Sequence, residues 1–150
     1  MTAPALAALY QSLVLAHNRT PRHLGTLVDP SHHAVGVNPL CGDRLELWLK
    51  VGEGRIVEVG HHIEASALTR AMSSMMAERV HGLPILAARE LATRMLADCR
   101  PGGMLERERV GDLADWQGVL GHPNRIKSLT LPWATLLAAL DGQGQASTET

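Results

Sequence analysis

Strict alternation of apolar and polar side chains in the first half of the chain constrains the fold most. Residues 45–51 read LELWLKV, in which every second side chain is aliphatic. This period of two places the aliphatic side chains on one face of a β-strand. The sequence GEG at residues 52–54 follows as a hairpin turn, and residues 55–61 return as the partner strand, with Val57 and Val59 expected on one face. A sheet with one covered and one wetter face is typical of antiparallel strands backed by helices.

Helical spacing surrounds this hairpin. The apolar residues of the segment 6–14 repeat at intervals of three and four, and Pro21 follows that run. A weaker strand candidate covers residues 33–37, and further helical runs are predicted at 66–81, 84–99, 112–120 and 128–140. We therefore predict an α+β fold: a small antiparallel sheet of about three strands with helices packed on one face. Residues 1–141 are expected to form a single domain, and residues 142–150 a flexible tail.

Charge and composition exclude several classes of function. The chain carries 14 Lys plus Arg against 15 Asp plus Glu, so it has no basic excess with which to bind nucleic acid. Its apolar runs are too short to span a bilayer, and we expect neither a membrane segment nor a signal peptide. Two cysteines are too few for a disulfide framework or for a metal site made of cysteines alone. Free thiols are typical of a cytoplasmic protein.

The turn at residues 38–44, with the sequence NPLCGDR, holds the residues best suited to chemistry. Cys41 and Asp43 lie two positions apart, and Gly42 between them allows a backbone conformation that aims both side chains outward. Such a pair could bind a borderline metal through sulfur and oxygen, or leave one exposed thiol for sulfur transfer. Alternatively, Cys41 is incidental and Asp43 hydrogen-bonds the backbone of its own loop. The local pattern alone favours this second interpretation.

Motifs along nearly the whole chain resemble those of the SufU/NifU-type, IscU-like iron–sulfur cluster assembly scaffolds. The NPLCGDR turn is similar to the family's NPxCGDR loop. The other similar segments, in the family's order, are residues 9–25, 75–76, 111–119 and 125–133. The long stretch between the second and third ligand positions resembles the SufU branch rather than the shorter IscU branch. The resemblance implies an α+β fold, a role in iron–sulfur assembly, and a site of three cysteines and one aspartate for iron, zinc or a cluster.

Carried over position by position, the resemblance leaves only part of this ligand set. Cys41 and Asp43 are present, whereas the second and third cysteine positions hold Ser66 and Ser128. A serine hydroxyl stays protonated near neutral pH and is a poor ligand for zinc or ferrous iron. Both serines are better explained as N-caps of the helices that follow, with Thr130 as an alternative cap, because Pro132 belongs in a first helical turn.

Other side chains could in principle replace the missing thiols. His61 and His62 lie near the second ligand position, but neighbouring strand residues point to opposite faces, so at most one could reach Cys41. His62 is kept as a possible metal ligand, although two exposed histidines at a strand end are the favoured interpretation. Cys99 matches no ligand position and is predicted to be a core thiol. The methionines at positions 72, 75 and 76 are likewise predicted to pack in the core.

Two functions of different classes follow. The first is an iron–sulfur assembly protein that acts as a scaffold or sulfur acceptor through Cys41, with a weak metal site completed by Asp43 and with His62 as a further candidate ligand. Its partner would be a cysteine desulfurase or another assembly protein. The chain itself is expected to be a scaffold or sulfur acceptor rather than a turnover enzyme. The second is a non-catalytic binding module that keeps the scaffold's surface for such a partner and binds no metal.

Overall fold

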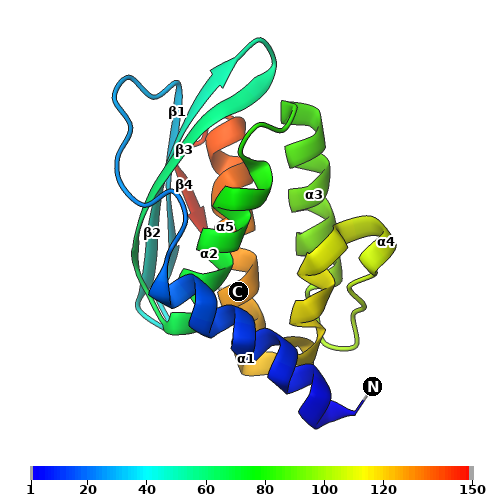
Figure 1. Cartoon of the computed structure of the whole chain (residues 1–150). Coiled ribbons are helices and arrows are strands. Elements are labelled where there is room, and N and C mark those ends of the chain that lie inside the picture. The colour runs from blue at the N-terminus through cyan, green and yellow to red at the C-terminus, as the bar shows by residue number, and fades with distance from the viewer. Residues whose placement is uncertain (1, 149–150) are drawn as a thin grey trace.

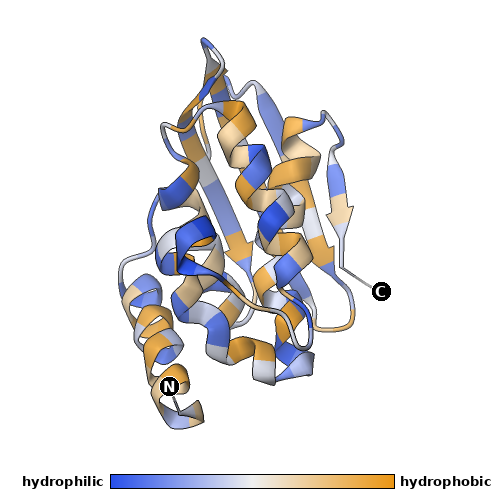
Figure 2. Ribbon diagram, turned by 90° about the vertical axis from the view of Figure 1, so that its right-hand side faces the viewer, coloured by the Kyte–Doolittle hydropathy of each residue, from blue (hydrophilic) through white to orange (hydrophobic). Residues whose placement is uncertain are grey.

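Three antiparallel strands form the centre of the sheet in the computed structural model, which describes residues 2–148 (Figure 1). They are β1 (His32–Asn38), β2 (Asp43–Gly52) and β3 (Arg55–Glu64), and β2 pairs with both neighbours. Leu45, Leu47 and Leu49 are fully buried, as their alternation predicted. The alternation is visible as hydrophobic and hydrophilic bands along the strands (Figure 2). The α+β fold with helices on one face of the sheet is confirmed.

A fourth strand, β4 (Gln145–Ser147), pairs in parallel with β1 and gives the order β3-β2-β1-β4. The sheet is therefore mixed rather than purely antiparallel. The stretch expected to be a flexible tail, residues 142–150, contains this strand, and its residues 149–150 lie outside the described part of the chain. The amide of Val35 donates to the carbonyl of Gly144 at 2.8 Å, and the amide of Thr148 donates to the carbonyl of Val37 at 3.2 Å. The strand forms because it satisfies backbone groups at the edge of β1, which side-chain composition does not reveal.

A β-bulge in β3 shifts the alternation of its side chains between the two faces of the sheet. Val51 lies opposite Ile56 and Lys50 lies opposite Glu58, so Val57 is the extra residue. Ile56 is buried, whereas the side chain of Val57 is 43% exposed. The prediction that Val57 and Val59 share a face is therefore wrong, because the inserted residue shifts the alternation by one position.

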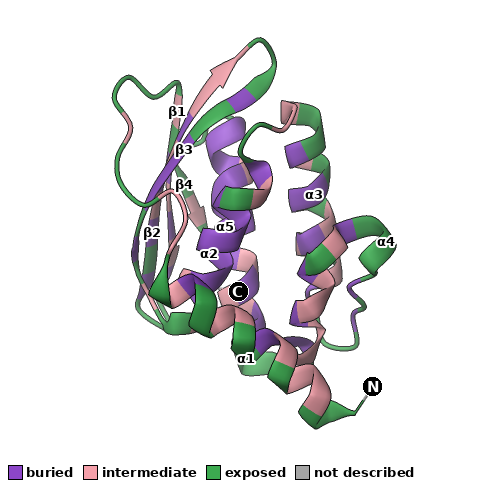
Figure 3. Ribbon diagram, in the orientation of Figure 1, coloured by how far each residue is buried: buried purple, intermediate pink, exposed green. Residues whose placement is uncertain are grey.

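In the described part of the chain, five α-helices lie on one side of the sheet: α1 (Ala3–Arg19), α2 (Ala67–Val80), α3 (Ile85–Asp98), α4 (Arg107–Val110) and α5 (Ile126–Leu140). Helices α2 and α5 lie next to the sheet and are mostly buried, and α3 packs on them from the other side (Figure 3). Helix α1 crosses one end of this layer and buries only Tyr10 and His17. Residues 111–121 form a 3₁₀ helix where a short helix was predicted. No described helix has the length and apolar character needed to cross a membrane.

Helix α5 begins earlier than its sequence suggests. Arg125 occupies the N-cap position without a side-chain cap, and Ser128 already lies in the first turn. The prediction that Ser128 or Thr130 caps this helix is wrong. Pro132 lies inside the helix, where its missing N–H leaves the carbonyl of Ser128 without the usual partner. Burial of Leu129, Pro132 and Trp133 accompanies this placement, so tertiary packing outweighs the local preference of proline.

The segment between α1 and β1 crosses the sheet on the side away from the helices (Figure 1). Its residue Leu24 makes a parallel bridge with His61 of β3. The amide of Gly25 donates to the carbonyl of His61 at 2.9 Å. A Cβ added at Gly60 would lie 2.3 Å from the carbonyl oxygen of Gly25 and 3.1 Å from the Leu27 side chain. The absence of a side chain at residue 60 is therefore what lets this segment approach the sheet.

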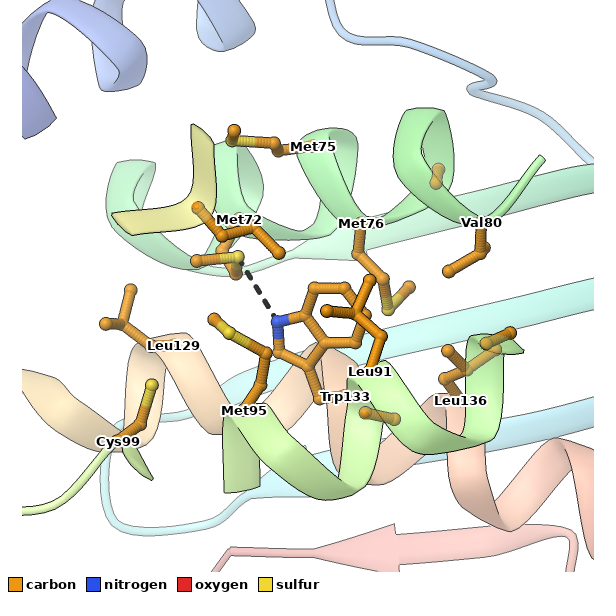
Figure 4. Packing of buried hydrophobic residues seen from close by; sticks show 14 of the residues in the cluster. Met72, Met75, Met76, Val80, Leu91, Met95, Cys99, Leu129, Trp133 and Leu136 are labelled. Atoms are coloured by element: carbon orange, nitrogen blue, oxygen red, sulfur yellow. Dashed lines mark hydrogen bonds between the residues drawn. The ribbon is translucent and has the colours of Figure 1, made fainter. Parts of the chain in front are cut away.

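Methionine and tryptophan fill the centre of the core in a chain that lacks phenylalanine. The indole N–H of Trp133 donates to the sulfur of Met72 at 3.4 Å, and Trp116 donates in the same way to Met75 at 3.1 Å. Figure 4 shows the Trp133 ring surrounded by side chains from α2 and α3. Because Met72, Met75 and Met76 are all buried, their prediction as core residues is confirmed.

Candidate functional site

The turn between β1 and β2 presents Cys41 to solvent. The side chain of Asn38, itself buried, shapes this turn: its Oδ1 accepts from the amide of Leu40 at 3.2 Å, and its Nδ2 donates to Cys41 Sγ at 3.6 Å. The amide of Cys41 donates back to the carbonyl of Asn38 at 3.2 Å. Gly42 follows with a φ of 72°, a conformation that favours glycine. Asn38 therefore fixes the turn and supplies a hydrogen-bond donor to the exposed sulfur.

Asp43 points away from Cys41 and into the protein. It is the first residue of β2 and only 5% exposed. Its Oδ1 accepts from the amide of Ser66 at 3.1 Å, and its Oδ2 accepts from the hydroxyl of Thr69 at 2.8 Å. The expectation that Gly42 aims both Cys41 and Asp43 outward is correct for the thiol and wrong for the carboxylate. The alternative in which Asp43 bonds its own loop is not what the structure shows either, because its partners come from the start of α2.

Ser66 is the N-cap of α2. Its Oγ accepts from the amide of Thr69 at 3.3 Å and lies 3.1 Å from the Thr69 hydroxyl. The predicted capping role of Ser66 is confirmed, and the structure brings this residue directly against Asp43.

Ser128, by contrast, is half-buried in the first turn of α5. No hydrogen bond among the described residues joins it to Cys41 or Asp43.

His61 is fully buried, contrary to the interpretation of two exposed histidines at the strand end. Its Nδ1 lies 2.8 Å from the hydroxyl of Ser73 and its Nε2 lies 2.6 Å from the carbonyl oxygen of Arg22. Burial lowers the pKa of His61, which favours the neutral ring. Both ring nitrogens are therefore engaged, and neither is available to a metal.

His62 lies on the opposite face of the sheet from Asp43. It pairs across the strands with Glu46, and its Nε2 lies 3.4 Å from Glu64 Oε1. Asp43 and Leu45 face the helices, whereas the alternate residues of β2, among them Glu46, face the other side of the sheet. The structure does not bring His62 to the carboxylate with which it was expected to share a metal.

Cys99, at the end of α3, is a core thiol as predicted. It is 4% exposed and lies in the layer of side chains drawn in Figure 4. Burial, with the charge of Asp98, raises its pKa to about 12. This thiol is therefore protonated and inert at neutral pH.

The donors near Cys41 do not fit a tetrahedral zinc ion. Such a site needs four ligands, usually thiolate or imidazole. Here one thiol is exposed, the carboxylate of Asp43 already accepts two hydrogen bonds, and Ser66 caps a helix. Over residues 2–148 no group of three or more His, Cys, Asp or Glu side chains is arranged to hold a metal ion.

Two residues that shape the site, Thr69 and Asn38, have roles that were not predicted from the sequence. Thr69 lies three positions after the N-cap, a position at which a polar side chain commonly reaches back toward the cap, and that spacing could have indicated it. Asn38 precedes a proline in a turn, where asparagine side chains often bond the backbone two residues on. The contact between Thr69 and Asp43 has no local signal, because 26 residues separate them.

Comparisons with known proteins agree with this fold. The model of the NifU-like N-terminal domain matches residues 9–115. The zinc-dependent sulfurtransferase SufU of Bacillus subtilis (strain 168) is 30% identical over 132 residues, which cover 87% of this chain and 88% of that protein. The iron–sulfur cluster assembly scaffold protein IscU of Streptococcus pyogenes serotype M1 is 30% identical over 146 residues, which cover 97% of this chain and 91% of that protein.

Solved structures show the same likeness. A putative iron–sulfur scaffold of the SUF system from Fervidobacterium islandicum AW-1 superposes with a TM-score of 0.81 at 23% identity, covering 89% of this chain and 97% of that one. The N-terminal part of a NifU-like protein from Brucella abortus superposes with a TM-score of 0.76 at 25% identity, covering 95% and 97%. These likenesses support the fold.

Proposed function

Because this chain belongs to the NifU-like N-terminal domain family of iron–sulfur cluster assembly proteins, we propose that it serves that assembly as a sulfur acceptor through Cys41. The observation that carries the proposal is the contrast between two neighbours in one turn. The sulfur of Cys41 is exposed and accepts a hydrogen bond from Asn38, whereas the carboxylate of Asp43 is buried and engaged. The thiol is free to react, whereas the carboxylate is held inside the protein by two hydrogen bonds.

The proposed step needs one thiol and no metal. The Cys41 thiol loses its proton to solvent, and the thiolate attacks the outer sulfur of a donor persulfide. A new sulfur–sulfur bond forms on Cys41 while the donor's sulfur–sulfur bond breaks. The donor leaves as a thiolate, so one sulfur atom moves and no external oxidant or reductant is consumed. The Asn38 amide, which donates to Sγ, supports the negative charge that develops on that atom.

The chemistry of the step indicates the partner. A cysteine desulfurase, or another assembly protein that carries a persulfide, would supply the sulfur, in line with the sulfurtransferase that resembles this chain. Iron and the finished cluster are cargo of the wider assembly rather than ligands of this site. We place the reaction in the cytoplasm, where thiols stay reduced. The protein is an acceptor and carrier rather than a turnover enzyme.

Transfer of labelled sulfur tests this proposal. The protein is incubated with a cysteine desulfurase and radiolabelled cysteine, and label is measured on the wild type, Cys41→Ala and Cys99→Ala. We expect label on the wild type and on Cys99→Ala, and a loss to background on Cys41→Ala. Intact-mass measurement should show the addition of one sulfur atom to the same two proteins.

A protein that stays unlabelled, while a three-cysteine relative is labelled under identical conditions, would exclude the acceptor function. The binding-module alternative would then be left, and it predicts that unlabelled protein still binds the desulfurase. A pull-down with Cys41→Ala tests this alternative, because binding through the surrounding surface does not need the thiol, and loss of binding in this variant would contradict it.

A further inference from the structure

We propose that Asp43, Ser66 and Thr69 form a hydrogen-bonded ring that joins β2 to α2 and makes the fold at this site independent of metal. The family resemblance implies a metal held between residues 41, 43, 66 and 128. In this chain two of those residues, Asp43 and Ser66, are joined to each other directly. The inference goes beyond sulfur transfer and does not depend on it, because none of the three residues needs to react.

The hydrogen atoms of the ring can all be assigned without conflict. The Thr69 hydroxyl must donate to Asp43 Oδ2, because a carboxylate only accepts. The Ser66 hydroxyl then donates to Thr69 Oγ1 and accepts from the Thr69 amide, and the Ser66 amide donates to Asp43 Oδ1. Four hydrogen bonds close a ring in which each donor is used once. A ring satisfied in this way needs no ion to complete it.

The position of the ring explains why a carboxylate is stable there. Asp43 lies at the N-terminus of α2, a helix of 14 residues, where unpaired backbone amides and the helix dipole favour negative charge. Asp43 is 5% exposed and Thr69 is fully buried, whereas Ser66 is exposed, so the carboxylate side of the ring is shielded from water and its capping side is not. Each oxygen of Asp43 already accepts one hydrogen bond, so a metal ion would have only the remaining lone pair of each oxygen, on a carboxylate that is almost fully buried. Serine at position 66 therefore completes a different structure from the one a ligating cysteine would build.

Thermal unfolding of matched variants tests the ring. Thr69→Val keeps the shape of the side chain but removes the donor to Asp43 and the acceptor for Ser66. Asp43→Asn replaces one accepting oxygen by an amide. We expect each variant to lower Tm by roughly 4 °C or more for a chain of this size. Thr93→Val, on the exposed side of α3, and Asp29→Asn, at an exposed residue whose φ of 56° asparagine tolerates, should leave Tm close to that of the wild type.

Removal of metal with a chelator provides a second test of the inference. Wild-type protein purified without chelator is melted before and after treatment with EDTA, and its zinc content is measured at both steps. We expect the same Tm in both melts, whether or not zinc is removed. A fall in Tm on loss of zinc would overturn the inference. It would also be overturned if Thr69→Val had the same Tm as the control Thr93→Val. Failure of the ring leaves the labelling of Cys41 untouched, so the two proposals fail separately.

Discussion

At the scale of single residues, burial separates the chemistry of the two cysteines. Cys41 lies on an exposed turn and Cys99 is 4% exposed in the core, where burial raises its pKa to about 12. Reaction with a disulfide reagent requires both access and a thiolate. The two thiols should therefore differ sharply in reactivity although their side chains are identical.

We expect one thiol per chain to react with Ellman's reagent in native buffer at pH 8, and both to react in guanidinium chloride. The Cys41→Ala protein should show no reaction until it is unfolded. Cys99→Ala, as the matched control, should react natively like the wild type. Rapid reaction of Cys99 in folded Cys41→Ala would show that the core is open where the structure has it closed.

Residues at the site also show how far local reasoning reaches. The capping role of Ser66 could be predicted because a cap bonds an amide only three residues away. The inward direction of Asp43 could not, because its partners lie 23 and 26 residues further along the chain. The sequence motif shows that Cys41 and Asp43 are two positions apart. Only tertiary contacts determine that Cys41 faces water and Asp43 does not.

At the scale of elements, the hairpin was predictable and its surroundings were not. The alternation in β2 has a period of two that any strand with one buried face must show. Strand β4 depends on backbone pairing, the bulge at Val57 on one extra residue, and the start of α5 on burial around Pro132. These three features arise from contacts between segments that are distant in sequence, so no local sequence pattern predicts them.

The close approach of the crossing segment to β3 can be tested at Gly60. Gly60→Ala places a methyl group 2.3 Å from the carbonyl oxygen of Gly25, so backbone must move to admit it. We expect a loss of about 1–3 kcal/mol in the free energy of unfolding, measured by urea denaturation. Gly121→Ala is the control, because no neighbouring atom lies within 4 Å of the added carbon, and its change should stay within roughly 0.5 kcal/mol. Equal stability of the two variants would contradict the packing described.

At the scale of the whole molecule, buried histidines connect α1, β3 and α2. The hydroxyl of Ser74 in α2 lies 2.8 Å from His17 Nδ1 and accepts from the amide of Arg22 at 2.8 Å. His17 is 5% exposed, and burial, reinforced by the charge of Arg22, lowers its pKa from 6.5; Glu78 and Asp112 act in the opposite direction. The folded protein therefore favours the neutral imidazole, whereas the unfolded chain binds a proton with the ordinary affinity.

This difference sets the direction of the pH dependence. Below pH 6.5 and down to the lowered pKa of His17, the unfolded chain binds more protons than the folded one, so the free energy of unfolding falls as the pH falls. The stabilisation is fully present above pH 6.5. We expect Tm to be lower at pH 5.5 than at pH 7.5, and the difference to shrink in His17→Gln. His122→Gln, at an exposed residue, should keep the wild-type difference, and an unchanged difference in His17→Gln would contradict this assignment.

The separation of the two thiols has a last consequence, for stoichiometry. With Cys99 enclosed in the core, an oxidised Cys41 has no second thiol of its own chain with which to close a disulfide. Oxidation in air should therefore crosslink two molecules or add a small thiol, and never produce an internal bridge. If Cys41 accepts sulfur as proposed, the same geometry lets it pass that sulfur only to another molecule, so each chain would carry one transferred sulfur atom at a time.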